Sequence, residues 1–243
     1  MLELVFLGIV VGVISGFFGV GGGTILVPLL LILGYETKIA IGITIVQMVF
    51  SSIYGSYLNY KKGTLDIAMI TTVGVGGFIG ALFSGMLVSM ISSQTLEIFF
   101  LLFAIFALVR LFFTTKEGLE QKEGGKILLF AIGLILGAIS MSIGVGGSIV
   151  LVPILVGFLH VPLKKAISAG LFFVVFSSVS GLISHTMSGY IDYKSGIVIG
   201  LASLVGVYIG IYFKDSVDAT LQKRLLVSFY ILIVSYLITR IFF

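Results

Sequence analysis

The chain has 243 residues, of which 59% are hydrophobic and only 10% are charged. This composition excludes a soluble globular domain, because too few polar residues are present to cover a water-exposed surface. The formal net charge is +4, but the basic residues stand in short segments between apolar runs and form no single surface for nucleic acid. There is no cysteine, which excludes disulfides and cysteine-ligated metals.

Ten apolar elements follow one another along the chain and predict an all-α integral membrane protein. About 20 helical residues span the hydrocarbon core of a bilayer, and most of the elements approach or exceed that length. The first begins without a basic leader and is followed by glycines, so we expect it to remain in the mature protein. The approximate limits are 2–18, 24–34, 38–59, 65–90, 96–113, 126–143, 149–159, 164–186, 195–213 and 221–242.

Two of these elements are too short to span. At about 1.5 Å per residue, the segment from Thr24 to Gly34 reaches about 16 Å, against roughly 30 Å of hydrocarbon. The segment 149–159 has the same defect, and each follows a glycine cluster. Both are predicted to be half-helices of broken or re-entrant structures. The flanking elements either both cross or form a hairpin, so eight to ten transmembrane or re-entrant elements are expected.

An internal repeat relates the two halves of the chain. A shift of 125 positions aligns identical residues from Gly8 and Gly133 to Pro28 and Pro153, and a shift of 126 continues the alignment as far as Gly80 and Gly206. Prolines, paired serines and loop aspartates recur in the same order, which indicates a duplication. Residues 1–115 and 126–243 are therefore predicted to be two membrane repeats of one transport domain, joined by a linker at about 114–125.

The basic residues predict the orientation of each half. If each glycine cluster and its flanking elements add no net crossing, each half crosses the membrane an odd number of times, and the repeats are inverted. With both termini outside and the linker in the cytoplasm, eleven of the fourteen basic residues lie on the cytoplasmic side. Lys38, Lys194 and Arg240 remain outside. Inverted repeats are typical of secondary transporters, with a binding site near the midplane.

The two glycine clusters are the leading candidates for that site. Glycine lets the backbone unwind and approach a ligand, and the helix that follows presents free N–H groups and the positive end of its dipole. Such a site binds anions without a charged side chain. The alternative is that the glycines only allow close helix crossing, which we favour for the spaced pairs Gly12 and Gly16, Gly133 and Gly137, and Gly206 and Gly210. The candidate residues of the clusters are Gly21, Gly22, Gly23, Thr24, Gly146, Gly147 and Ser148.

Polar residues inside two long apolar elements are the second set of candidates. Ser51, Ser52, Ser177 and Ser178 lie near the middle of these elements, with Gln47 one turn from Ser51. Polar groups at membrane depth face protein or a cavity, so these residues are expected to line the route; serines also bond back to their own helix. Pro28 and Pro153 withdraw a donor from the carbonyls of Thr24 and Ile149, which leaves those carbonyls for a ligand, a water or a coupling cation; the equally favoured alternative is a tolerated proline near a helix start.

The charged residues are weaker candidates. Asp66 and Asp192 are interpreted as helix-start residues, as is Glu97. His185 aligns with Asn59 near the end of a helix and is interpreted as structural. No acidic or basic side chain is placed clearly at the midplane, which argues against a carboxylate proton wire and a cation pump.

Two motifs resemble those of a known family. GFFGVGGGTILVP runs from Gly16 to Pro28 and SIGVGGSIVLVP from Ser142 to Pro153, with serine pairs at 51–52 and 177–178. Over nearly its whole length the chain resembles the sulfite exporter TauE/SafE family, also called the toluene sulfonate uptake permease family. The resemblance implies transport of sulfite, sulfonates or related sulfur compounds, while export or uptake stays open. Ser148 departs from the pattern of the first cluster, where Gly23 stands.

The sequence therefore predicts a multi-pass transporter of the inner (plasma) membrane that moves a small sulfur-containing anion by alternating access. The alternatives are an uncoupled anion channel and, less favoured, an intramembrane enzyme, for which no nucleophile with its base and no metal cluster is found. The expected partners are the lipid bilayer and the anion, with no nucleic acid; the sequence leaves a homodimer open. No cofactor and no metal ion is expected.

Overall fold

The computed structural model describes residues 1–65, 67–112 and 125–242, and these residues form eleven helices. The prediction of an all-α protein is thereby confirmed. The helices begin and end within a few residues of the predicted elements, because long apolar runs fix their extent. They are α1 (Leu2–Phe18), α2 (Gly23–Ile32), α3 (Thr37–Lys61), α4 (Ile67–Ala81), α5 (Ser84–Met90), α6 (Ser93–Phe112), α7 (Lys126–Ser142), α8 (Ser148–Phe158), α9 (Leu163–Ser188), α10 (Tyr193–Ser216) and α11 (Ala219–Phe242).

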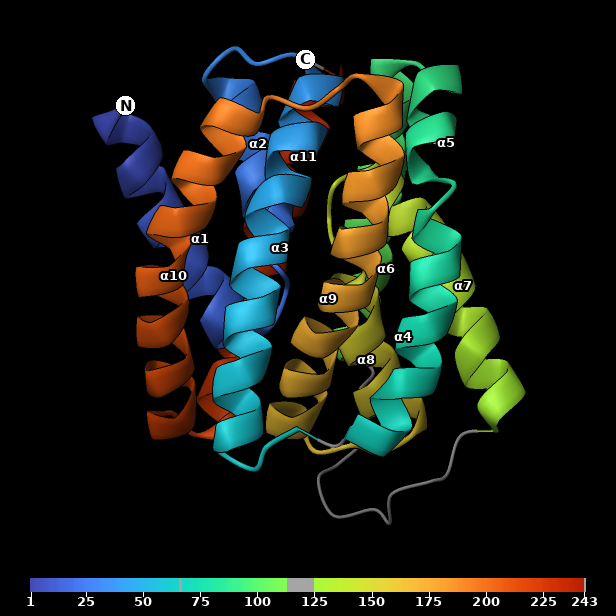
Figure 1. Ribbon diagram of the computed structural model, residues 1–243. Coiled ribbons are helices and arrows are strands. Elements are labelled where there is room, and N and C mark those ends of the chain that lie inside the picture. Colours follow the sequence, from blue (N-terminus) through green and yellow to red (C-terminus); the bar gives the residue numbers. More distant parts are fainter. Residues whose placement is uncertain (66, 113–124, 243) are drawn as a thin grey trace.

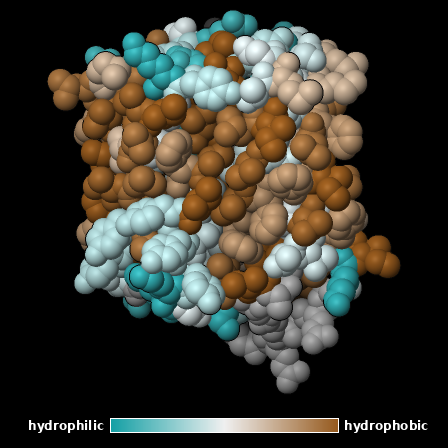
Figure 2. Space-filling model, in the orientation of Figure 1, coloured by the Kyte–Doolittle hydropathy of each residue, from teal (hydrophilic) through white to brown (hydrophobic). Residues whose placement is uncertain are grey.

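The face of the molecule shown in Figure 2 carries an apolar belt between two more polar ends. Large apolar side chains such as Leu201, Val205 and Leu232 are exposed on the helices, where a water-soluble protein would be polar. Five segments of the described helices are long and apolar enough to cross a bilayer, and five further apolar helices are shorter. The protein is therefore an integral, multi-pass membrane protein.

The long helices α3 and α9 lie side by side at the centre and run in opposite directions (Figure 1). The helices around them exchange partners between the two halves of the sequence. Helix α1 packs on α10, and α7 packs on α4; α10 also packs on α3, and α4 on α9. The two halves are consequently interlocked and share one core.

The spaced glycine pairs lie at these helix crossings. A Cβ atom on Gly16 of α1 would lie 2.5 Å from the carbonyl oxygen of Val207 on α10, and one on Gly12 would overlap the Ser203 backbone. On the other side of the molecule, Gly137 of α7 meets the backbone of Gly77 on α4 in the same way. The prediction that these pairs serve close helix packing is confirmed.

The short helices α2 and α8 each form a re-entrant hairpin with the helix before them, α1 and α7. The N-terminus lies at the same end of the molecule as the start of α3, so α1 enters from that end and α2 returns to it (Figure 1). Helix α7 enters from the opposite end at Lys126, and α8 returns there, where α9 begins. Two hairpins thus enter from opposite ends, and this answers the question of crossing or re-entry that the sequence left open.

The element predicted at 65–90 is divided in two, which corrects the expected ten elements to eleven. Helix α4 ends at Ala81 and α5 begins at Ser84. The Ser184 hydroxyl of α9 donates to the Leu82 carbonyl at 2.7 Å and accepts from the Gly85 N–H at 2.9 Å. The break therefore follows from hydrogen bonds to another helix, because no proline in this segment marks it.

Candidate functional site

The two glycine clusters form matching turns at the tips of the hairpins. In the first turn Gly19, Gly21 and Gly22 have positive φ angles, and in the second Gly144, Gly146 and Gly147 do. Gly22 (φ 81°) is the residue before α2 and Gly147 (φ 76°) the residue before α8. Only glycine adopts this left-handed backbone without strain. The predicted unwinding of the backbone at both clusters is confirmed.

The two turns meet inside the molecule. A Cβ atom on Gly23 would overlap the carbonyl oxygen of Gly144, so the backbones of the two hairpin tips touch. Met48 of α3 and Val174 of α9 lie against both Gly21 and Gly146. Met48 and Val174 have 0% exposure, and both glycines are buried. The structure therefore brings the two predicted clusters together at one place.

Unlike side chains cover the two turns. A Cβ atom on Gly22 would lie 2.6 Å from Oε1 and 2.9 Å from Nε2 of Gln47. At the equivalent place in the second half, a Cβ on Gly147 would lie 2.6 Å from a ring carbon of Phe173 and 2.8 Å from the Ser140 hydroxyl. The amide of Gln47 is thus matched by an aromatic ring, so the two sides of the site differ in polarity.

Several of the predicted polar residues are buried without a hydrogen-bond partner in the described part of the chain. The atoms are Oγ1 of Thr24, both amide atoms of Gln47, and the hydroxyls of Ser148 and Ser178. The Ser15 hydroxyl is also without a partner, and the sequence analysis did not identify it as a candidate. Each of these side chains has 0% exposure. A buried polar group left unpaired costs about 1–3 kcal/mol, so each of these groups needs an explanation.

The other three predicted serines bond to backbone. Ser51 donates to the Met48 carbonyl at 3.3 Å and Ser52 to the Val49 carbonyl at 3.5 Å, both within α3. Ser177 is placed among the carbonyls of Phe173, Val174 and Gly146, at 3.3 to 3.5 Å. The Ser177 hydroxyl therefore contacts a glycine cluster, whereas the hydroxyls of Ser51 and Ser52 form hydrogen bonds within their own helix.

The electrostatics of the turns favour an anion. Helices α2 and α8 both begin at the turns, so the first N–H groups of each helix face the centre of the molecule. Each helix N-terminus carries roughly half a positive charge, and the two together supply about one. No acidic side chain occurs in the described turns or in α2 and α8, so nothing there opposes a negative ligand.

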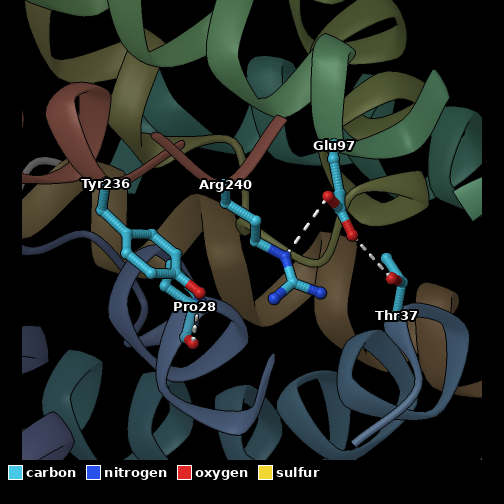
Figure 3. A network of polar contacts seen from close by, with 5 residues as sticks. All are labelled: Pro28, Thr37, Glu97, Tyr236 and Arg240. Carbon is cyan, nitrogen blue, oxygen red and sulfur yellow. Dashed lines mark hydrogen bonds and ion pairs between the residues drawn. The ribbon is translucent and has the colours of Figure 1, made fainter. Parts of the chain in front are cut away.

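Helix α11 supports both hairpins from outside. The Tyr230 hydroxyl donates to the Ile149 carbonyl at 3.2 Å, and Gln222 donates to the Phe17 carbonyl at 2.9 Å. Ile149 is the residue whose helical partner Pro153 removes, so this carbonyl has a protein donor. Figure 3 shows the other end of α11, where Tyr236 donates to the Pro28 carbonyl at 3.3 Å.

An ionic network joins α11 to the helices beside it at the same end. Arg240 Nε lies 3.4 Å from Glu97 Oε2, and Thr37 donates to Glu97 Oε1 at 2.9 Å (Figure 3). Arg240 is one of the three basic residues predicted outside, and its charge is balanced by Glu97. The network ties α11, α6 and the start of α3 together and so fixes the frame around α2.

The structure also shows a buried lysine that sequence reasoning placed among the basic residues of the cytoplasmic side. Lys214 of α10 has 0% exposure; its Nζ donates to Asn59 Oδ1 at 2.7 Å and to the Ser168 hydroxyl at 3.1 Å. Thr64 lies 3.0 Å from the same hydroxyl. The alignment of Asn59 with His185 in the repeat was the one signal in the sequence for a polar group at this place. The sequence did not indicate that Lys214 is buried, because a single lysine near a helix end is usually exposed.

The interpretation of Asp192 as a helix-start residue is confirmed, because its carboxylate accepts from the Ser195 N–H at 3.1 Å. The hydrogen bond from the Ser195 hydroxyl lowers the pKa of the Asp192 carboxyl below its usual range. Asp66, its predicted counterpart, lies outside the described residues, and so does the linker at 114–125 apart from Gly125.

Comparison with known proteins agrees with the fold. The profile of a family described as sulfite exporter TauE/SafE matches residues 4–237. The probable membrane transporter protein YunE of Bacillus subtilis is 23% identical and covers 92% of this chain and 90% of its own. The probable membrane transporter protein MJ0441 of Methanocaldococcus jannaschii is 25% identical, over 88% of this chain and 86% of its own. No solved structure matches the chain significantly.

Proposed function

Because the chain belongs to the sulfite exporter TauE/SafE family, which makes it a membrane transporter, we propose that it carries a small sulfur-containing anion, a sulfite or sulfonate, by alternating access. The observation that carries this proposal is a set of buried, unpartnered polar atoms at two helix N-termini: those of Thr24 and Ser148 in the first turns of α2 and α8, and those of Gln47 beside Gly22. Neutral donors around a positive dipole suit an oxyanion, which offers several acceptor oxygens and a spread charge.

The absence of a charged side chain from the described turns sets the expected affinity. An arginine would hold an oxyanion through two parallel hydrogen bonds, whereas hydroxyls, an amide and backbone N–H groups hold it more weakly. Weak binding allows release, which a transporter needs at each turnover. The proposal therefore includes modest affinity and selection by size and shape. The pair of Gln47 and Phe173 favours a ligand with a polar side and an apolar side.

The geometry favours a transporter over an uncoupled channel. The candidate site is closed to both ends, because the residues of both turns are buried. Two hairpins that enter from opposite ends and meet at their tips are what inverted repeats would produce, and we include that arrangement in the proposal. For the site to open to each side of the membrane in turn, the two hairpin tips would have to move apart. An intramembrane enzyme has less support, since the relatives are named as transporters.

Flux into proteoliposomes tests the proposal. Purified protein should take up labelled sulfite or ethanesulfonate, and should take up no small cation when these anions are absent. Gln47→Leu removes the amide over the first turn and should lower anion flux at least tenfold; Gln94→Leu, on an exposed residue of α6, should leave it unchanged. Uptake of small cations without any uptake of sulfur oxyanions would refute the proposed substrate class. Equal flux through Gln47→Leu and wild type would remove Gln47 from the site.

A further inference from the structure

The two central helices carry matching stripes of buried residues that lead away from the turns. On α3 the stripe is Met48, Ser52 and Asn59, and on α9 it is Val174, Ser178 and His185. The spacing of four and then seven residues keeps each stripe on one face of its helix. All six side chains have 0% exposure.

The stripes start at the turns and end near opposite faces of the molecule. Met48 and Val174 touch both glycine clusters, while Asn59 and His185 lie eleven residues further along, at a distance of about 16 Å. Because α3 and α9 run in opposite directions, Asn59 lies toward one end and His185 toward the end that holds both termini (Figure 1).

The two stripes end in different chemistry. Asn59 accepts a hydrogen bond from Nζ of the buried Lys214, so a lysine stands at that end. His185 is also fully buried, but neither ring nitrogen makes a hydrogen bond to the described residues. Its ring lies near the Met141 backbone of α7, outside hydrogen-bonding geometry. A buried imidazole without partners has no evident structural task.

The charges around His185 are few. Helices α5 and α7 pack on this part of α9: Gly85 lies against Ser184, and the Met141 side chain against Gly181. The described ranges of α4, α5 and α8 contain no ionisable side chain, and α7 has only Lys126, at its far end. At the near end of α3, Lys38 lies 5.2 Å from the centre of the Tyr190 ring. Tyr193 bonds Thr186, and Arg240 of α11 pairs with Glu97.

We infer that His185, at the end of the α9 stripe, is an anion-docking position that works when it is protonated, and that it lies toward the opposite end of the molecule from Asn59 and its donor Lys214. This inference rests on the proposed function. An anion beside an imidazole favours its protonated form, so the proton and the anion bind together. Anion affinity at this end therefore rises as the pH falls. At the other end the stripe finishes at Asn59, whose amide does not titrate, so we expect no such pH dependence there.

Measurement of initial flux from each side separately tests the inference. Intact cells and inside-out vesicles present opposite ends of the protein, and ethanesulfonate keeps a fixed charge over the whole range. From the side of the termini, the KM of wild type should rise about tenfold between pH 5.5 and 8 with kcat nearly constant. From the other side the KM should change less than twofold. His185→Asn, which installs the residue of the first repeat, should abolish the pH dependence and keep the high KM.

The matched control is His160→Asn, because the chain has two histidines and asparagine tolerates the left-handed backbone of His160 (φ 55°). It should keep the wild-type pH profile. His185→Gln, which keeps more of the volume, should behave as His185→Asn if the titrating ring is what matters. A pH-dependent KM retained by both His185 variants, or a pH-independent KM in wild type, would overturn the inference while the proposed function stands. No flux of any sulfur oxyanion in wild type would refute the proposed function, and this inference with it.

Discussion

At the residue scale, Gly22 has a steric and a conformational reason to be glycine. Its φ angle is 81°, and a Cβ atom would meet the Gln47 amide at 2.6 Å. The two reasons are separable because Gly34 has a similar φ of 86° with no atom within 4 Å of its Cβ position.

Gly22→Ala should therefore lower anion flux by at least tenfold, since the methyl displaces Gln47 from the site. Gly34→Ala carries the same backbone strain, roughly 1–2 kcal/mol, and should lower the melting temperature without reducing flux in the protein that remains folded. Flux in proteoliposomes, normalised to folded protein, gives the comparison. Equal loss of flux in the two variants would assign the effect to strain and would count against a ligand at Gly22.

Tyr230 is a second residue with a defined task. Its hydroxyl is a donor to the carbonyl that Pro153 leaves without a helical partner. Tyr230→Phe should cost about 1–2 kcal/mol, seen as a lower melting temperature in detergent. Tyr208→Phe, on an exposed residue of α10, is the matched control and should melt as wild type does. If both variants melt alike, α8 does not depend on α11 for this carbonyl.

The sequence identified the two glycine clusters but could not show which residues pack against them. The substitution of Ser148 for Gly23 in the second cluster looked like an inequality of the halves. In the structure, Gly23 lies against Thr44, and Ser148 lies against Gly170, which occupies the place of Thr44 in the repeat. In each half one member of the contacting pair is glycine and the other carries a side chain, so the volume of the pair is similar. Lys214 was missed for a similar reason, because burial near a helix end depends on the packing of α3 and α9.

At the scale of the elements, ten apolar runs predicted the helices because hydrophobic length is a local property. The interruption between α4 and α5 was not predicted, because its cause is not local. Residues about 100 positions away on α9 supply the hydrogen bonds: Ser180 donates to the Phe78 carbonyl at 2.5 Å, and Ser184 bonds both Leu82 and Gly85. A reader of the sequence sees only serines in a helix, which more often bond to their own backbone.

Ser184→Ala should destabilise the protein by about 1 kcal/mol, because it removes two buried hydrogen bonds that hold the break. Ser89→Ala is a suitable control, since the Ser89 hydroxyl is exposed and bonds within α5, to the Met86 carbonyl. Thermal melting in one detergent compares the two. A melting temperature for Ser184→Ala equal to that of the control would show that the break persists without the α9 hydroxyl.

At the scale of the whole molecule, both termini lie at one end and the start of α7 lies at the other (Figure 1). We predict from the basic residues that the end with the termini faces outward. Single cysteines at Leu2, 88% exposed, and at Gly125, also exposed, have no cysteine background in this chain. Leu2→Cys should react with an impermeant reagent in intact cells, and Gly125→Cys only after lysis. The reverse result would invert the predicted topology.

The interlocked packing has a consequence for biosynthesis. Helix α1 finds its partner in α10, which is made about 190 residues later; at about 5–20 residues per second, that is a delay of roughly 10–40 s. During this interval the glycine-rich face of α1 has no α10 to pack against. The contact between α1 and α10 therefore forms late in the assembly of this protein.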